Sequence, residues 1–162
     1  MPSVPADSEP LPPEADPASA LVERARSLRA GPGDRATAPL KGRHVAIASA
    51  GHDTPSARRF ERAAVALGAR VSHIGPESLV LDDTRLEATA RILGSLYDAI
   101  DFIPMPAERA RFLQNIAGVP VFADLGGERS PLRALLTPAT GAAESEAELL
   151  SLVEAVLVRA VR

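Results

Sequence analysis

The chain has 162 residues, of which 46% are hydrophobic and only 3% aromatic, and its formal net charge at pH 7 is −3. This is enough apolar material for one domain whose core is built from Ala, Val, Leu and Ile. The mildly acidic balance offers no basic footprint for nucleic acid. The absence of cysteine excludes disulfides, thiolate metal sites and cysteine nucleophiles.

Nothing in the sequence predicts a membrane segment or a targeting signal. No apolar run reaches the roughly 18–20 residues that a membrane-spanning helix needs. The first residues lack the basic stretch and apolar core of a secretory signal. We therefore expect a cytoplasmic protein that binds neither membrane nor nucleic acid.

The N-terminal residues 1–17 hold six of the fifteen prolines together with several acids. Such a segment buries too little apolar surface to offset its ordering entropy, which predicts a disordered tail. Apolar residues then recur at helical spacing over 18–30, and Gly31-Pro32 ends that helix. Residues 31–39 are interpreted as a loop.

From Leu40 onward, short apolar segments alternate with amphipathic ones. The short segments predict strands at 44–49, 69–75, 98–103 and 119–124, and the amphipathic ones predict helices at 54–67, 85–97 and 107–117. Residues 76–84 are expected to form a loop. This order predicts a single three-layer α/β domain with a four-stranded parallel sheet flanked by helices.

The last part of the chain predicts a short helical piece after 125–131 and then a long helix over 144–161. Six residues of the long helix form one apolar stripe: Leu149, Leu152, Val153, Val156, Leu157 and Ala160. A stripe of this kind needs a surface to cover. We therefore expect the C-terminal helix to pack back on the domain.

Four local patterns occur in an order that is typical of one enzyme family. They are "PLKGR" (39–43), "FERAAVALGA" (60–69), "LEATARILGSLYDAI" (86–100) and "IAGVPVFADL" (116–125). Together they resemble the N-terminal, carbamoyl-phosphate-binding domain of the aspartate/ornithine carbamoyltransferases, over about residues 18–140. The resemblance implies a Rossmann-like carbamoyltransferase domain over 18–143, between the tail (1–17) and a C-terminal helix (144–162). The family's second, amino-acid-binding domain would begin where this chain ends.

The family's phosphate loop, Ser-Thr-Arg-Thr-Arg, matches "DTPSA" (53–57) in this chain. Thr54 and Ser56 keep the two hydroxyls, whereas Pro55 and Ala57 replace both arginines. The change removes two cations able to pair with phosphate, and Asp53 adds a negative charge. We interpret Asp53, Thr54 and Ser56 as helix caps rather than ligand contacts. A shifted match on "PSAR" (55–58) would restore one arginine but requires a three-residue deletion in the helix.

The other motif positions have also changed type. The family's His-Pro-x-Gln motif falls on "SPLR" (130–133), where only Pro131 is kept, and the arginine that ends its third strand falls near Ile103. Arg133 is either an anion contact or a solvated residue at a helix start. With these groups gone, the electrostatic stabilisation that carbamoyl transfer needs has no visible source. We therefore assign no catalytic residue, and Thr54, Ser56 and Arg133 are the candidate anion-binding residues.

The remaining polar residues are given structural roles. Arg91 is expected to brace helix packing. The three histidines, His44, His52 and His73, lack ligand spacing, although His52 lies in a loop that a ligand could reach. The pair at 82–83 is interpreted as solvated, so we expect no metal and no cofactor. Asp124 and the glycines at 126–127 follow the fourth strand, where open α/β sheets bind ligands.

Three functions are compatible with this pattern. The first is a catalytically inactive pseudoenzyme of amino acid metabolism that acts as a structural or regulatory subunit. The family's first domains associate around a threefold axis, so the resemblance implies a homotrimer or docking onto a partner enzyme. The second is a binding module that holds phosphate or carbamoyl phosphate at Thr54 and Ser56. The third is one half of a split carbamoyltransferase, active only with a partner chain.

Overall fold

The computed structural model describes residues 16–31, 33–49, 51, 53–75, 82–138 and 141–161. The strands are β1 (His44–Ser49), β2 (Arg70–Ile74), β3 (Ala99–Ile103) and β4 (Val121–Ala123). The helices are α1 (Pro17–Ala30), α2 (Gly33–Ala36), α3 (Pro55–Ala66), α4 (Asp83–Leu96), α5 (Ala107–Ala117), the 3-10 helix η2 (Pro131–Leu135) and α6 (Ala142–Ala160). Strands and helices alternate from β1 to β4 as the sequence predicts.

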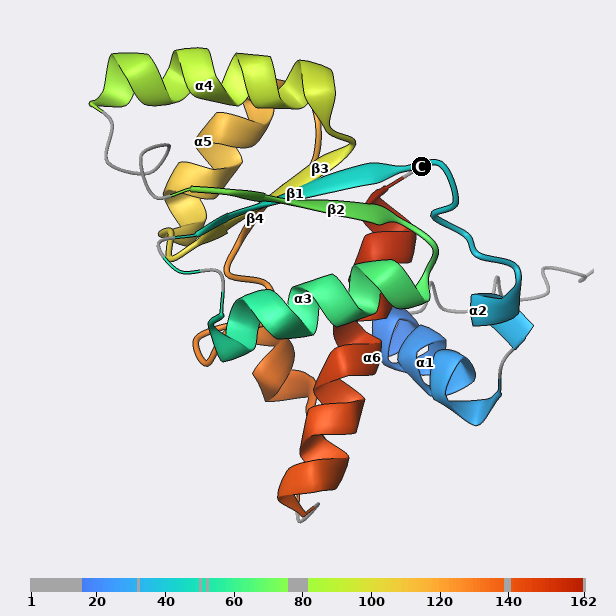
Figure 1. Cartoon of the computed structure of the whole chain (residues 1–162). Coiled ribbons are helices and arrows are strands. Elements are labelled where there is room, and N and C mark those ends of the chain that lie inside the picture. Colours follow the sequence, from blue (N-terminus) through green and yellow to red (C-terminus); the bar gives the residue numbers. More distant parts are fainter. Residues whose placement is uncertain are drawn as a thin grey trace, which may run out of the picture.

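The four strands form one parallel sheet in the order β2-β1-β3-β4. Helix α3 lies on one face, with α6 packed against α3 and α1 packed against α6, and α4 and α5 cover the other face (Figure 1). The predicted three-layer α/β domain is thereby confirmed. In a parallel sheet, right-handed crossovers through helices place cover on both faces.

Alternation along the inner strands divides the core into two clusters. On β1 and β3, one set of side chains joins the cluster formed with α1, α3 and α6, and the alternate set joins the cluster formed with α4 and α5. Val45 and Ile47 belong to the first, Ala46 and Ala48 to the second. Alternate residues of each strand point to opposite faces of the sheet, and helices cover both faces. Both strands are therefore nearly continuous apolar runs in the sequence.

The C-terminal helix α6 packs on α1 and α3, which confirms that it folds back on the domain (Figure 1). Four of the six residues of the predicted stripe are buried, while Val156 and Ala160 are partly buried. The helix also buries polar side chains. Among these, Glu148 accepts hydrogen bonds from the backbone N–H and hydroxyl of Thr137, at 3.2 and 2.8 Å. This contact ties the segment before α6 to the helix itself.

Several boundaries differ from the sequence prediction. The expected loop 31–39 contains the short helix α2, and α1 begins at Pro17, one residue earlier than predicted. Helix α4 begins at Asp83 because Asp82 caps it by accepting the N–H of Arg85 at 2.9 Å. Strand β4 covers only three of its six predicted residues and ends before Asp124, whose φ of 55° leaves the extended region.

Two predictions concern segments beyond this description. The proposed tail at 1–17 falls almost wholly on residues 1–15, and most of the loop at 76–84 falls on residues 76–81, all outside the described residues. Within the described ranges, no helix is both long and apolar enough to cross a membrane.

Candidate functional site

A cleft of about 340 Å³ opens at the carboxyl ends of the strands. Open α/β sheets bind ligands at this edge, because loops and helix N-termini converge there. Its walls come from the start of α3, the residues after β3 and the loop after β4, and they comprise Thr54, Pro55, Ser56, Arg59, Ile103, Pro104, Asp124, Gly127, Glu128 and Arg129. Two of the three candidate anion-binding residues, Thr54 and Ser56, thus line one cleft.

Thr54 is the N-cap of α3. Its backbone is extended (φ −81°, ψ 148°), Pro55 occupies the first helical turn, and its hydroxyl accepts the N–H of Ala57 at 3.2 Å. Asp53 instead pairs with the exposed side chain of Arg58. The prediction that Asp53, Thr54 and Ser56 are caps is therefore right for Thr54 and wrong for the other two.

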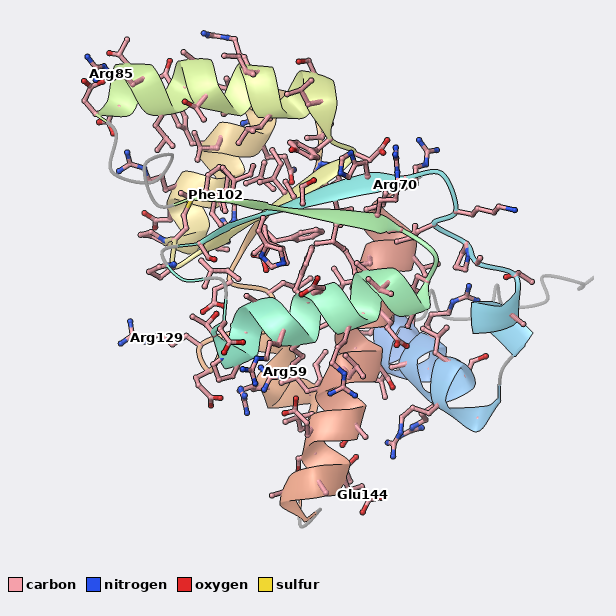
Figure 2. The ribbon with its side chains drawn as sticks, in the orientation of Figure 1. Arg59, Arg70, Arg85, Phe102, Arg129 and Glu144 are labelled. Atoms are coloured by element: carbon pink, nitrogen blue, oxygen red, sulfur yellow. The ribbon has the colours of Figure 1, made fainter. Side chains whose placement is uncertain are left out.

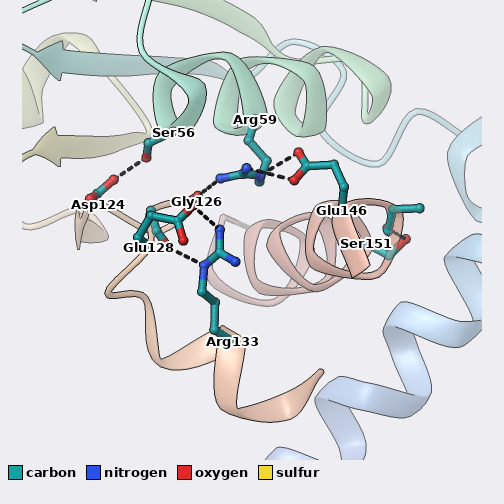
Figure 3. A network of polar contacts seen from close by, with 10 residues as sticks. Ser56, Arg59, Asp124, Gly126, Glu128, Arg133, Glu146 and Ser151 are labelled. Atoms are coloured by element: carbon teal, nitrogen blue, oxygen red, sulfur yellow. Dashed lines mark hydrogen bonds and ion pairs between the residues drawn. The ribbon is translucent and has the colours of Figure 1, made fainter. Parts of the chain in front are cut away.

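Ser56 and Asp124 join the start of α3 to the loop after β4. The Ser56 hydroxyl donates to the Asp124 carboxylate (Figure 3). Asp124 adopts a left-handed backbone conformation, and its carboxylate lies against Gly127 so closely that no Cβ would fit there. The hydroxyl that matches the family's phosphate loop is thus already bonded to an anion of this chain.

Arg59 is the buried cation of the cleft, and the sequence analysis did not single it out. Its side chain is only 6% exposed. Its Nε and Nη2 each donate to Glu146 of α6 at 2.8 Å, and Nη1 donates to the carbonyl of Gly126 (Figure 3). These hydrogen bonds lower the pKa of Glu146. In this bidentate ion pair both side chains stay charged, and the Glu146 carboxylate neutralises the Arg59 guanidinium.

Arg133, the third candidate anion-binding residue, does not line the cleft. Its Nε donates to the carbonyl of Gly127 at 3.1 Å, and its Nη2 pairs with Glu128 at 2.6 Å. Arg129 does line the cleft, yet its exposed side chain points away into solvent (Figure 2). Each arginine of this loop is therefore engaged by the protein or turned outward.

The positions that match the family's lost arginines carry apolar residues. Ala57 is fully buried in the core, so its side chain contributes nothing polar to the cleft. Pro55 and Ile103 line the cleft without charge. Arg58, which the shifted match would supply, is held by Asp53 and is not part of the cleft wall.

Asp101 lies on β3, in contact with the loop after β4, and has no exposed surface. Its carboxylate accepts the N–H of Leu125 at 3.2 and 3.3 Å. Burial, assisted by the charge of nearby Asp124, raises the pKa of Asp101 to about 8. The sequence analysis missed this residue, although a single acid in the apolar strand "AIDFI" was the signal.

The other residues given structural roles lie apart from the cleft. His44 Nε2 is 2.8 Å from the Ser72 hydroxyl, and His73 pairs with Glu61 at 3.3 Å. His52 falls outside the described residues. Arg91 is exposed on α4 and forms no hydrogen bond or ion pair with a described residue, and its packing role stays a prediction.

The prediction that Asp82 and Asp83 lie in a loop is wrong, because the two residues form the start of helix α4. Asp82 caps α4, and Asp83 pairs with Arg109 of α5. The described residues contain no group of three or more His, Cys, Asp or Glu side chains able to hold a metal ion.

Comparison with known proteins gives one consistent assignment. No family model matches the chain. The chain is 38% identical over 93 residues to the catabolic ornithine carbamoyltransferase of Pseudomonas putida. These 93 residues are 57% of this chain and 28% of that enzyme. The fold matches anabolic ornithine carbamoyltransferase from Campylobacter jejuni, with a TM-score of 0.59 at 21% identity, over 73% of this chain and 38% of that one.

Two further solved structures of ornithine carbamoyltransferases match the fold of this chain. The mitochondrial ornithine carbamoyltransferase of Coccidioides immitis has a TM-score of 0.59 at 24% identity, and the match covers 73% of this chain and 39% of that one. The enzyme from Pyrococcus furiosus has a TM-score of 0.58 at 23% identity, with 73% and 38% covered. The chain thus spans only 28% to 39% of the length of these relatives. The resemblance that the sequence motifs indicate is therefore confirmed: this chain has a carbamoyltransferase-like fold, and its partial coverage fits the N-terminal domain of the ornithine carbamoyltransferases that it resembles.

Proposed function

We propose that this chain is a catalytically inactive carbamoyltransferase-like domain that acts as a structural or regulatory subunit. One observation carries the proposal: the cleft supplies its own anions where the family's motif would receive phosphate. Ser56 donates to Asp124, and Arg59 is committed to Glu146. A phosphate would have to displace these contacts or approach Asp124 and Glu128 at the cleft wall.

The electrostatic balance supports the absence of catalysis. Carbamoyl transfer needs preorganised positive groups aimed at the developing charge of the transition state. The described lining of the cleft holds two carboxylates and two arginines, of which Arg59 is buried and already paired and Arg129 points outward into solvent. The positive end of α3 remains, but Thr54 has already satisfied the N–H of Ala57.

The role that we propose is assembly in the cytoplasm, within amino acid metabolism. The resemblance implies either a homotrimer or docking onto a partner enzyme. Both uses require the fold and its outer surfaces, and neither requires the lost arginines.

The decisive test is an assay for citrulline and carbamoyl-aspartate, with carbamoyl phosphate and either ornithine or aspartate as substrates. The chain would be assayed alone and in the complex isolated with its native partners. We expect no product above a boiled-protein control. Product from the chain alone would overturn the proposal, and product only from a complex in which Ser56→Ala abolishes turnover would support a split carbamoyltransferase instead.

A second candidate function is supported by the cleft volume and by the two hydroxyls at the start of α3. In this alternative the cleft holds phosphate or carbamoyl phosphate without reaction. Binding at millimolar concentration or better, measured by calorimetry and weakened in Thr54→Ala but not in Thr54→Ser, would favour it. The serine variant keeps the helix cap, so it separates loss of the hydroxyl from loss of the methyl group.

A further inference from the structure

A groove between the first turns of α4 and α5 is separate from the cleft. It encloses about 470 Å³, and its apolar lining comes from Leu86, Pro106, Phe112 and Leu113. It shares no lining residue with the cleft. Phe112 is 52% exposed, whereas Phe60 and Phe102 are fully buried. An aromatic ring left half-exposed beside an apolar depression is a feature of binding surfaces.

The rim of this groove carries a surplus of negative charge. Its charged residues are Asp83, Glu87, Glu108 and Arg109. Arg109 is already paired with Asp83. Glu87 and Glu108 form no ion pair with any described residue, so two carboxylates remain to attract a cation.

We propose that this groove is a docking surface for a partner protein that presents a segment with Lys or Arg beside an apolar side chain. The apolar side chain would pack against Phe112 and Leu86, and the cation would lie between Glu87 and Glu108. This inference names the kind of partner that the proposed docking role requires, and it rests on that role.

Charge complementarity favours this occupant over the alternatives. The chain's own segment 76–81, "PESLVL", carries one acid and no base, so it does not match the acidic rim. A nucleic acid would be repelled by the same carboxylates. A cationic amphipathic segment satisfies both the apolar lining and the rim.

The test uses two fluorescein-labelled, twelve-residue amphipathic probe peptides, one of Lys and Leu and the other with every Lys replaced by Glu. Binding to the full chain is measured by fluorescence anisotropy at low and at physiological salt. We expect the Lys/Leu peptide to bind and the Glu/Leu peptide not to bind. Added salt should weaken binding, because Glu108 on the rim is exposed to solvent and Glu87 is partly exposed.

Matched variants locate the binding surface. Phe112→Ser should weaken the Lys/Leu peptide roughly tenfold, as expected for an interface anchor. The double variant Glu87→Gln/Glu108→Gln should weaken it roughly fivefold, because each rim charge contributes modestly. The controls are Ile92→Ser, at a residue 59% exposed on α4 outside the groove lining, and Glu144→Gln on α6. Both controls should bind as the parent chain does.

Three outcomes would overturn the inference: no binding of the Lys/Leu peptide, equal losses in groove and control variants, or a change in the chain's own oligomeric mass caused by Phe112→Ser. A change in oligomeric mass would mean that the groove is an interface between copies of this chain. The product assay is independent of these results. If product appears while binding follows the groove variants, the proposed inactivity fails and the docking surface stands.

Discussion

Buried Asp101 adds a pH-dependent contribution to the stability of the fold. Its carboxyl group has no exposed surface, and the backbone N–H of Leu125, rather than water, donates a hydrogen bond to it. Burial in low dielectric therefore dominates and raises the pKa of Asp101 from 3.8 to about 8. At neutral pH the folded protein holds a proton here that the unfolded chain releases.

Replacing Asp101 by Asn should stabilise the protein at neutral and alkaline pH. Between pH 3.8 and about 8 the folded state binds more protons at this residue than the unfolded state, so stability falls as pH rises through that window. Because Asn cannot ionise, the variant loses this pH-dependent destabilisation, which amounts to about 1.4 kcal/mol for each unit by which the pKa is raised. Urea unfolding at pH 5, 7 and 9 should show the advantage of the variant growing between pH 5 and 8 and then levelling off. Parallel stability profiles for the two proteins would contradict the assignment.

Gly127 is the residue whose missing Cβ leaves room for the Asp124 carboxylate in the cleft wall. A Cβ on this glycine would collide with the Asp124 carboxylate. Gly127→Ala should therefore displace Asp124, break its bond with Ser56 and destabilise the protein by about 1–3 kcal/mol. Thermal unfolding is the measurement, with Gly33→Ala as control because nothing lies within 4 Å of a Cβ built there. Equal melting temperatures for the two variants would show that the loop adapts without cost.

Among the elements, α3 is the one that connects the sheet to the C-terminal helix. Its apolar face joins the core, and its N-terminus forms the cleft wall. On the side facing α6, Arg59 reaches Glu146 and the loop carbonyl of Gly126. One buried guanidinium thus fixes three segments of the chain relative to one another.

Removing the carboxylate in Glu146→Ala should destabilise the protein by about 1–3 kcal/mol, because a buried arginine loses its counter-ion. The exposure of Glu146 moderates this cost. The double variant Arg59→Met/Glu146→Ala should recover much of the loss, and chemical denaturation at pH 7 compares it with the parent protein and with the two single variants. Additive losses in the double variant would mean that the two side chains do not act as a pair.

The Arg59–Glu146 pair also makes stability depend on pH, but in the direction opposite to that of Asp101. The pKa of Glu146 is lowered by Arg59, so its contribution is present above the carboxyl's ordinary value and is lost as pH falls through the lowered value. In Glu146→Gln the acid limb of the stability profile should therefore be flatter than in the parent protein.

On the scale of the whole molecule, the proposed role depends on assembly rather than on the cleft. A homotrimer would have three times the chain mass of 16.9 kDa. Light scattering of the purified chain, and the mass and composition of the complex isolated from its native host, should return either this value or a larger hetero-assembly. A stable monomer in both preparations would contradict the structural role.

The sequence predicted the fold well because the fold depends on periodic patterns. Apolar runs of strand length alternate with amphipathic runs, and residues such as Thr54, Gly68 and Gly118 mark where helices begin or end. Short elements were less predictable. Helix α2 has four residues and no apolar periodicity, and Asp82 caps α4 although its neighbours read as a loop.

The site was only partly predictable, because its contacts join distant parts of the chain. Thr54 acts within its own turn, so its capping role could be read locally. Ser56 and Asp124 are 68 positions apart, and Arg59 and Glu146 are 87 apart. No spacing rule connects such residues, and the sequence analysis accordingly assigned Ser56 to the cap and passed over Arg59.

The sequence by itself determined the α/β architecture, the C-terminal helix and the resemblance to carbamoyltransferases, together with the loss of the two loop arginines. These are properties of local pattern and of residue identity. Only the tertiary structure decided which distant partners the polar groups of the cleft bond: Arg59 pairs with Glu146, and Ser56 donates to Asp124. The physical reason is that an ion pair depends on distance in space, and the crossovers of a parallel sheet bring together residues that the chain keeps far apart.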